Sequence, residues 1–294
     1  MQNSIKRDVT KKQIATAKHN LKLMKPDIDD TIVEHFWYTL VDLLEIEIKK
    51  SIFHTIIEKE KRVYELNWHD TAKKTVTAQI ITSPSTMYHN NNDNVLASRV
   101  SLWIPSKKEK EMLITRLYEN FFPWKWKTVV FDRSFCNRAF SQIHNWYCTQ
   151  EQYEIFMKTL ENELEKFIDK WYIIHNFFLY ISKEVQESRL TERSIDPKRM
   201  FRYSESDRNA LGNYDKIKAQ IPKIAKIYDK AWIPFTVVNT NDEELWFINF
   251  MKALLENLDY DKKSKKIDFT PDKNIVIDWV DEILKYTRQP NKPT

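Results

Sequence analysis

The chain contains one glycine and ten tryptophans among its 294 residues. Average usage places glycine near 7%, so about twenty would be expected in a chain of this length. Glycine permits a positive backbone φ and lets the main chain approach a ligand closely, and a domain of this size seldom does without it. Either the fold avoids such turns, or other residues occupy the positions where glycine would normally lie.

The rest of the composition is typical of a globular cytoplasmic protein. The chain is long enough for one large α/β domain or two small ones. Hydrophobic residues make up 42% of it, which supports a packed core, and charged residues make up 30%. No apolar run reaches the roughly eighteen residues of a membrane span, and the first residues lack the apolar core of a signal peptide. Cys136 and Cys148 have neither metal-ligand spacing nor the number needed for a disulfide framework, which predicts a reduced setting.

The net charge of +5 fits an anionic ligand, but it fits a neutral partner equally well. We expect neither a membrane nor a nucleic acid as partner.

Short apolar runs alternate with stretches of helical periodicity. The runs predict strands at 63–66, 100–102, 128–131, 172–181 and 235–238. Apolar spacing predicts helices over 30–61, 106–120, 149–170 and 242–258, and Thr149 with Gln152 forms a capping-box pattern before the third. We expect residues 1–30 to form a polar arm, 83–94 a surface loop and 288–294 a disordered tail. The alternation predicts a three-layer α/β/α fold with a mostly parallel five-stranded sheet.

Two segments carry residues suited to phosphate chemistry. The run at 128–131 ends in Asp132 and Arg133, at the strand end where parallel sheets bind ligands, and a carboxylate there can hold Mg²⁺ beside phosphates. Many strands also end in a solvated aspartate. A later cationic stretch could fork onto phosphate oxygens or form a solvated helix face: Arg189, Arg193, Lys198, Arg199, Arg202 and Arg208.

Residues 130–139 read VFDRSFCNRA. This segment resembles the Walker B segment of the polyphosphate kinase 2 family, usually written FDRSWYNRA. Segments 148–153, 181–187 and 196–197 also match, and so do Ser204, Asp207 and the pair Tyr214-Asp215, which lies where the family has Trp-Asp. The resemblance extends over about residues 35–260.

The resemblance implies a P-loop kinase-like fold over 31–265 with a helical lid at about 183–215, between the arm 1–30 and a C-terminal helix and tail at 266–294. It implies phosphoryl transfer, with Mg²⁺, between polyphosphate and ADP, AMP or a guanine nucleotide, in a homo-oligomer. A second possible activity is that of an ATP-dependent nucleotide kinase. It is less favoured, because the lid segment matches the polyphosphate kinase 2 family.

The resemblance also implies roles for individual residues. Asp70 and Asp132 would hold Mg²⁺ or orient the attacking phosphate oxygen, and Lys74 would contact phosphates. The remaining predicted phosphate or nucleotide contacts are Arg133, Asn137, Arg138 and the lid cations Arg189, Arg193, Arg199 and Arg202. Catalysis would consist chiefly of positioning and electrostatic stabilisation.

The phosphate loop departs from the family pattern EGxDAAGKG. Residues 67–75 read NWHDTAKKT, so Asp70 and Lys74 remain while Trp68 and Lys73 replace the two defining glycines. Such a loop binds phosphate through converging backbone N–H groups, which a tryptophan should obstruct. The alternative is therefore a catalytically inactive relative that acts as a binding or assembly module.

Several tryptophans fall where glycine would be natural. Trp146 and Trp171 occupy frequent glycine positions of the family, whose own tryptophan positions hold Phe135, Phe201, Tyr214 and Phe235; Trp103, Trp124 and Trp126 flank prolines and turns. One hypothesis is that the source organism reads UGA as glycine and the sequence was translated with UGA as tryptophan. The alternative is drift in an AT-rich genome. Recoding does not explain Lys73.

Overall fold

The computed structural model describes residues 30–69, 71–82, 97–101, 121–123, 127–134, 136–198, 200–203, 205–278, 282–283 and 285. Several predictions fall outside these residues: the arm before residue 30, the helix over 106–120, the loop at 83–94, the tail from 288, and single positions including Asp70, Arg199 and Ser204. None of the described helices has the length and apolarity to span a membrane.

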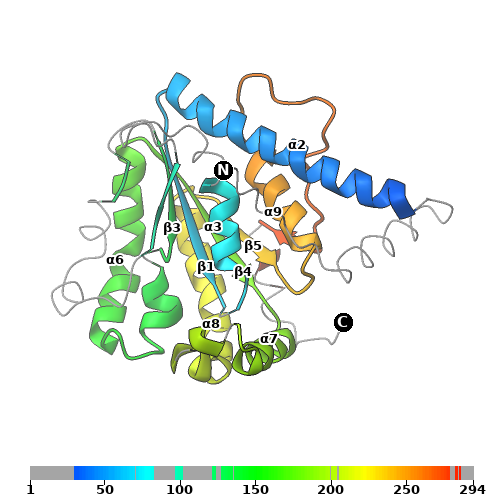
Figure 1. Cartoon of the computed structure of the whole chain (residues 1–294). Helices are drawn as coiled ribbons and strands as arrows, with labels where there is room; N and C mark the ends of the chain where they lie inside the picture. The colour runs from blue at the N-terminus through cyan, green and yellow to red at the C-terminus, as the bar shows by residue number, and fades with distance from the viewer. Residues whose placement is uncertain are drawn as a thin grey trace.

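A mostly parallel sheet forms the centre of the molecule (Figure 1). Its strands are β1 Lys61–Trp68, β2 Ala97–Val100, β3 Thr128–Asp132, β4 Tyr172–Tyr180, β5 Phe235–Asn239 and β6 Val276–Ile277. Their spatial order is β2-β3-β1-β4-β5-β6, and every neighbouring pair is parallel except β5 and β6. The parallel sheet and the α/β class are confirmed.

The prediction of five strands is wrong by one. All five predicted runs lie on or overlap the five parallel strands, although β2 shares only Val100 with its predicted run. The sixth strand, β6, has two residues and pairs antiparallel to β5. A strand of that length leaves no apolar run long enough to predict it.

Helices cover both faces of the sheet. Within the described residues they are α2 Asp30–Ile57, α3 Lys74–Thr82, α6 Gln150–Asp169, α7 Lys183–Ile195, α8 Glu205–Lys230 and α9 Leu245–Glu256, with a π-helical segment η3 Arg138–Gln142 and a short 3₁₀ helix η4 Met200–Arg202. Side chains from α2, α3 and α9 pack on one face, while those from α6, α8 and η3 pack on the other.

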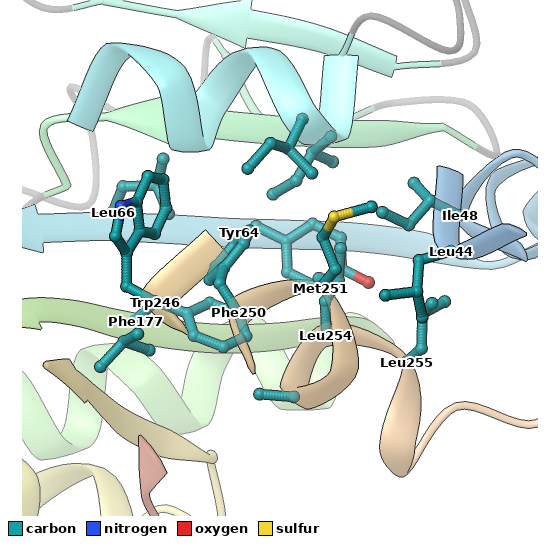
Figure 2. Packing of buried hydrophobic residues seen from close by; sticks show 14 of the residues in the cluster. Leu44, Ile48, Tyr64, Leu66, Phe177, Trp246, Phe250, Met251, Leu254 and Leu255 are labelled. Carbon is teal, nitrogen blue, oxygen red and sulfur yellow. The ribbon is translucent and has the colours of Figure 1, made fainter. Parts of the chain in front are cut away.

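The alternation of side chains along the strands produces these two cores. On β1, Tyr64 and Leu66 belong to the core under α2 and α9, whereas Val63 faces α6 and α8. Figure 2 shows Leu66, Tyr64 and Phe177 in the first core, where the rings of Phe177 and Phe250 of α9 have centroids 5.0 Å apart. Both faces are therefore buried, which confirms the three layers and explains why the strands read as nearly continuous apolar runs.

The predicted capping box is present at the start of α6. The Gln152 backbone N–H donates to Thr149 Oγ1 at 3.1 Å, and the Thr149 N–H donates to Gln152 Oε1 at 3.0 Å. These bonds satisfy two backbone groups that a helix start would otherwise leave unpaired, so they fix where α6 begins.

Candidate phosphate-binding site

The carboxyl ends of β1 and β3 lie side by side at one edge of the sheet. Leu66 of β1 is in register with Asp132 of β3. The loop that follows β1 leads directly into α3, which begins at Lys74. Because carboxyl ends of parallel strands form the ligand-binding edge of such sheets, this is where a ligand is expected.

Asp132 is the centre of a charged cluster at this edge. Its side chain is fully buried, and its Oδ1 lies 2.9 Å from the Nζ of Lys74. Its other oxygen accepts a hydrogen bond from the guanidinium of Arg99 on β2. The predicted pair Lys74 and Asp132 is thus brought together. Arg99 was missed, since a single arginine in a weak edge strand carries no signal of its neighbour.

The loop after β1 contains left-handed backbone without glycine. Thr71 has φ 69° and Lys73 has φ 61°, values that favour glycine because an L-residue places its Cβ against the backbone there. Lys73 Nζ lies 2.5 Å from Oε1 of Glu243, just before α9. The loop thus contains two left-handed turns in which side chains stand where glycine is usual.

Arg189 of α7 stabilises this loop. It donates hydrogen bonds to the carbonyl oxygens of Thr71 at 3.4 Å, Thr240 at 2.7 Å and Asn241 at 3.1 Å. Burial lowers the pKa of its guanidinium from the ordinary value. In this conformation the predicted lid cation therefore ties the loop after β1 to the loop after β5.

The other predicted cations take different positions. Arg193 pairs with Asp207 of α8 at 2.6 Å and so joins the two lid helices. Arg133 follows β3 with φ 114°. Arg138 is buried within η3, and the neighbouring Asn137 accepts a hydrogen bond from Ser141 at 2.6 Å. Arg199 and Asp70 lie outside the described residues, while Arg202 belongs to η4.

His69 connects the phosphate loop to α8. Its ring is buried, stacks on Tyr214 at 4.5 Å and meets the rings of Phe178 and Tyr180 edge-on. Burial lowers the pKa of His69 to about 3, with a smaller contribution from Lys218, so the ring is neutral. The beginning of the loop is therefore held by aromatic packing.

A buried polar network lies between the strands beneath the site. Ser134 Oγ donates to Asn67 at 2.9 Å, Asn67 donates to Asn176 at 3.2 Å, and Asn176 donates to Glu65 at 2.7 Å. Tyr228 of α8 also donates to Glu65. Burial raises the pKa of Glu65 to about 8, so this carboxyl is mostly protonated at neutral pH. The network fixes the end of β1 against the turn after Asp132.

The sequence that forms this site matches the model of a known protein family. The family model for polyphosphate kinase 2 matches residues 44–266. The chain belongs to the polyphosphate kinase 2 family.

Named relatives of this family support the match. The chain is 30% identical over 175 residues to ADP-polyphosphate phosphotransferase 1 of Rhizobium meliloti, covering 59% of this chain and 58% of the relative. It is 27% identical over 168 residues to a GDP-polyphosphate phosphotransferase of Mycolicibacterium smegmatis, covering 57% and 59%. The chain thus spans about three-fifths of the length of these curated relatives.

Solved structures of the polyphosphate kinase 2 family share the fold. The structure from Arthrobacter aurescens superposes with a TM-score of 0.60 at 17% identity, covering 79% of this chain and 83% of that one. A second, from Pseudomonas aeruginosa, gives a TM-score of 0.62 at 16% identity, covering 75% and 46%. The predicted P-loop kinase-like fold is confirmed.

A cavity of about 910 Å³ lies beside this polyphosphate kinase 2 core, between the segment after η3, the start of α6 and the middle of α8. Its lining includes His144, Trp146, Tyr147 and the amines of Lys216 and Lys223. Partial burial, with a smaller contribution from Lys216 and Lys223, lowers the pKa of His144 to about 4. The cavity is positively charged at neutral pH through its lysines alone.

Proposed function

We propose that this chain transfers phosphoryl groups between polyphosphate and a nucleoside mono- or diphosphate with the help of Mg²⁺. The observation that carries the proposal is the cluster of Lys74, Asp132 and Arg99 at the ligand-binding edge of a sheet with this family's fold. A carboxylate between two cations is suited to a site that receives both a divalent metal and phosphate oxygens.

The donor chemistry of the site fits Mg²⁺. Magnesium takes oxygen ligands and is usually held by one or two carboxylates, with substrate phosphates and waters completing its shell. Asp132 supplies such a carboxylate, and Asp70 is the second candidate. Bound Mg²⁺ would neutralise charge on the transferred phosphoryl group.

The cations of the chain would perform the remaining work. Lys74 would leave Asp132 in part and contact a phosphate oxygen, because a phosphate bears more negative charge than one carboxylate. Arg99 would orient Asp132 through its hydrogen bond. Closure of α7 and α8, joined through Arg193 and Asp207, would exclude water and limit hydrolysis.

The acceptor nucleotide is ADP, AMP or a guanine nucleotide in this proposal. Relatives are named for ADP and for GDP, which supports a nucleoside diphosphate. The homo-oligomeric state and the cytoplasmic location stay predictions.

The test is phosphoryl transfer from polyphosphate to ADP, AMP and GDP by the purified chain. Activity that needs Mg²⁺ and disappears in Asp132→Asn supports the proposal. The matched control is Glu161→Gln, which removes an exposed ion pair with Lys230 on the helices α6 and α8. Loss of activity in both variants, or in neither, would contradict the assigned role of Asp132.

An inactive binding module is the second candidate, and the loop after β1 favours it. Trp68 and Lys73 stand where phosphate loops carry glycine, and Lys73 is paired with Glu243. Such a module would bind polyphosphate without transferring phosphate to any of the three nucleotides. Binding and transfer measured on the same preparation separate the two candidates.

A further inference from the structure

Three helices end in turns built around a tryptophan. Trp232 follows α8 with φ 58°. Its N–H donates to the carbonyl of Asp229 at 3.0 Å, and the N–H of Ile233 donates to Tyr228 at 2.9 Å. This pair of hydrogen bonds defines a Schellman ending, in which the left-handed residue is most often glycine.

Trp146 and Trp171 occupy the same position in two further endings. Trp146 has φ 60°, and the N–H of Tyr147 beyond it donates to Gln142 at 2.8 Å. Trp171 has φ 62°, and its own N–H donates to Ile168 at 2.8 Å after α6. Each of these bonds is one of the two that close a Schellman turn.

Little of these three side chains packs against the rest of the protein. Their exposed fractions are 88% for Trp146, 86% for Trp171 and 92% for Trp232. A left-handed backbone costs an L-residue free energy, and for a bulky residue it is an outlier that surrounding contacts normally have to stabilise. Trp246 of α9, by contrast, is only 2% exposed and packs in the core (Figure 2).

We infer that positions 146, 171 and 232 are glycine in the protein as its own cell makes it, because that cell reads UGA as glycine. The inference goes beyond the proposed function and does not depend on it. It accounts for the placement of these tryptophans with one cause, and it moves the glycine count toward the expected value. The one glycine present, Gly212, lies inside α8 rather than at a turn.

Drift in an AT-rich genome does not produce this pattern. Drift toward AT-rich codons raises the number of lysines in a protein. It accounts for Lys59, Lys73 and Lys262, which also have positive φ. Lys59 even ends α2 with the same pair of hydrogen bonds, from Lys59 to Ile56 and from Glu60 to Thr55. Tryptophan has the single codon UGG in the standard code, which AT-rich drift depletes, so its gathering at helix ends requires the other cause.

The inference changes the cavity beside α8. Trp146 is part of its lining, so a glycine there would leave that part of the lining without a side chain.

The direct test is peptide mass spectrometry of the protein isolated from its native cell, together with the codons of its gene. We expect peptides with the mass of glycine at 146, 171 and 232, encoded by UGA. Trp246 is the internal control and should be tryptophan encoded by UGG. Tryptophan peptides or UGG codons at the three helix ends would overturn the inference.

A second test uses recombinant variants and needs no activity. Trp→Gly and Trp→Ala are made at each of 146, 171 and 232. Both remove the ring, but only glycine relieves the left-handed backbone, so each glycine variant should melt roughly 2–4 °C above its alanine partner.

Lys59→Gly against Lys59→Ala should show the same difference at the fourth ending, whereas Trp246→Gly should lower the melting temperature. Equal melting of the glycine and alanine variants at all three sites would contradict the requirement for glycine. Neither result depends on whether phosphate is transferred, so failure here is distinct from failure of the proposed function.

Discussion

The ends of β1 and β3 are neighbours in the sheet, but they differ in what they present to a ligand. At the end of β3, Asp132 is buried between Lys74 and Arg99, so the chemistry proposed there depends on side chains. The loop after β1, if it binds phosphate as proposed, would do so through its backbone, and here Thr71 and Lys73 hold left-handed turns that glycine normally provides. The charges of the proposed site are therefore in place, while side chains occupy the proposed backbone cradle.

This difference separates two requirements of phosphoryl transfer. Charge neutralisation needs particular side chains, whereas the cradle needs the absence of side chains. The first is satisfied by the printed sequence, and the second depends on what stands at position 68.

The largest effect is expected at the end of β3. Asp132→Asn removes the carboxylate proposed to hold Mg²⁺ and leaves Lys74 and Arg99 without their buried partner. We expect phosphoryl transfer to fall at least about 100-fold, the loss typical of removing one electrostatic group from an active site. Steady-state kinetics measures this, and circular dichroism establishes that the variant is folded. A retained rate would show that the acid at β3 is not part of the reaction.

The next effect tests the end of β1. Trp68→Gly restores the residue type that a phosphate loop needs at the point where β1 ends. We expect kcat/KM for polyphosphate-dependent transfer to rise by roughly 10-fold or more, since an unblocked backbone N–H cradle is worth several hydrogen bonds to charged oxygens.

Trp171→Gly is the matched control for this change. It makes the same substitution at an exposed helix end beside the first residue of β1, at the opposite end of that strand from Trp68, so it should leave the rate unaltered. If Trp68→Gly and Trp171→Gly give the same rate as the parent chain, tryptophan does not obstruct the loop.

A third prediction concerns the polar network that joins the two strand ends from below. Glu65 has a pKa of about 8 in the folded chain against an ordinary value of 4.5. Between these values the folded state binds more protons than the unfolded state, so the free energy of unfolding should be greatest below about pH 4.5 and fall as pH rises toward about 8.

Glu65→Gln removes this titration and keeps the size of the side chain. Denaturant unfolding at about pH 5 and about pH 8 should therefore show a decline in the parent chain that is reduced in the variant. An identical decline in both chains would mean that another group titrates.

The sequence predicted the side chains of the site better than their surroundings. Asp132 was found because it ends a clear apolar run, and Lys74 was found through the family pattern. Arg99 and the network of Glu65 and Asn176 were missed, because contacts between strands far apart in sequence leave no local periodicity. These partners become visible only when the strand order is known.

Helix α8 was predicted only in part, because the helical lid implied by the resemblance ends at about residue 215 and the helix continues to Lys230. Its buried residues recur at three- and four-residue steps: Ala210, Tyr214, Ile217, Ile221, Ile224 and Tyr228. The periodicity was readable, but Pro222 inside the helix argues against helical structure when the sequence is considered alone. Packing of this apolar face on β4 and β5 outweighs the lost hydrogen bond.

The smallest effect is expected for Lys73→Gly. The substitution relieves a φ of 61° but also removes the ion pair with Glu243, whose carboxylate is about half exposed. Relief of a left-handed backbone is worth about 1 kcal/mol, an exposed ion pair is worth about 0–1 kcal/mol, and added chain freedom costs some of the gain. The free energy of unfolding should therefore change by less than about 1 kcal/mol.

Glu243→Gln is the control, because it breaks the ion pair and leaves the backbone strained; it should be no more stable than the parent chain. Denaturant unfolding of the two variants separates the terms, and a Lys73→Gly chain less stable than Glu243→Gln would show that the loop does not need glycine at this turn.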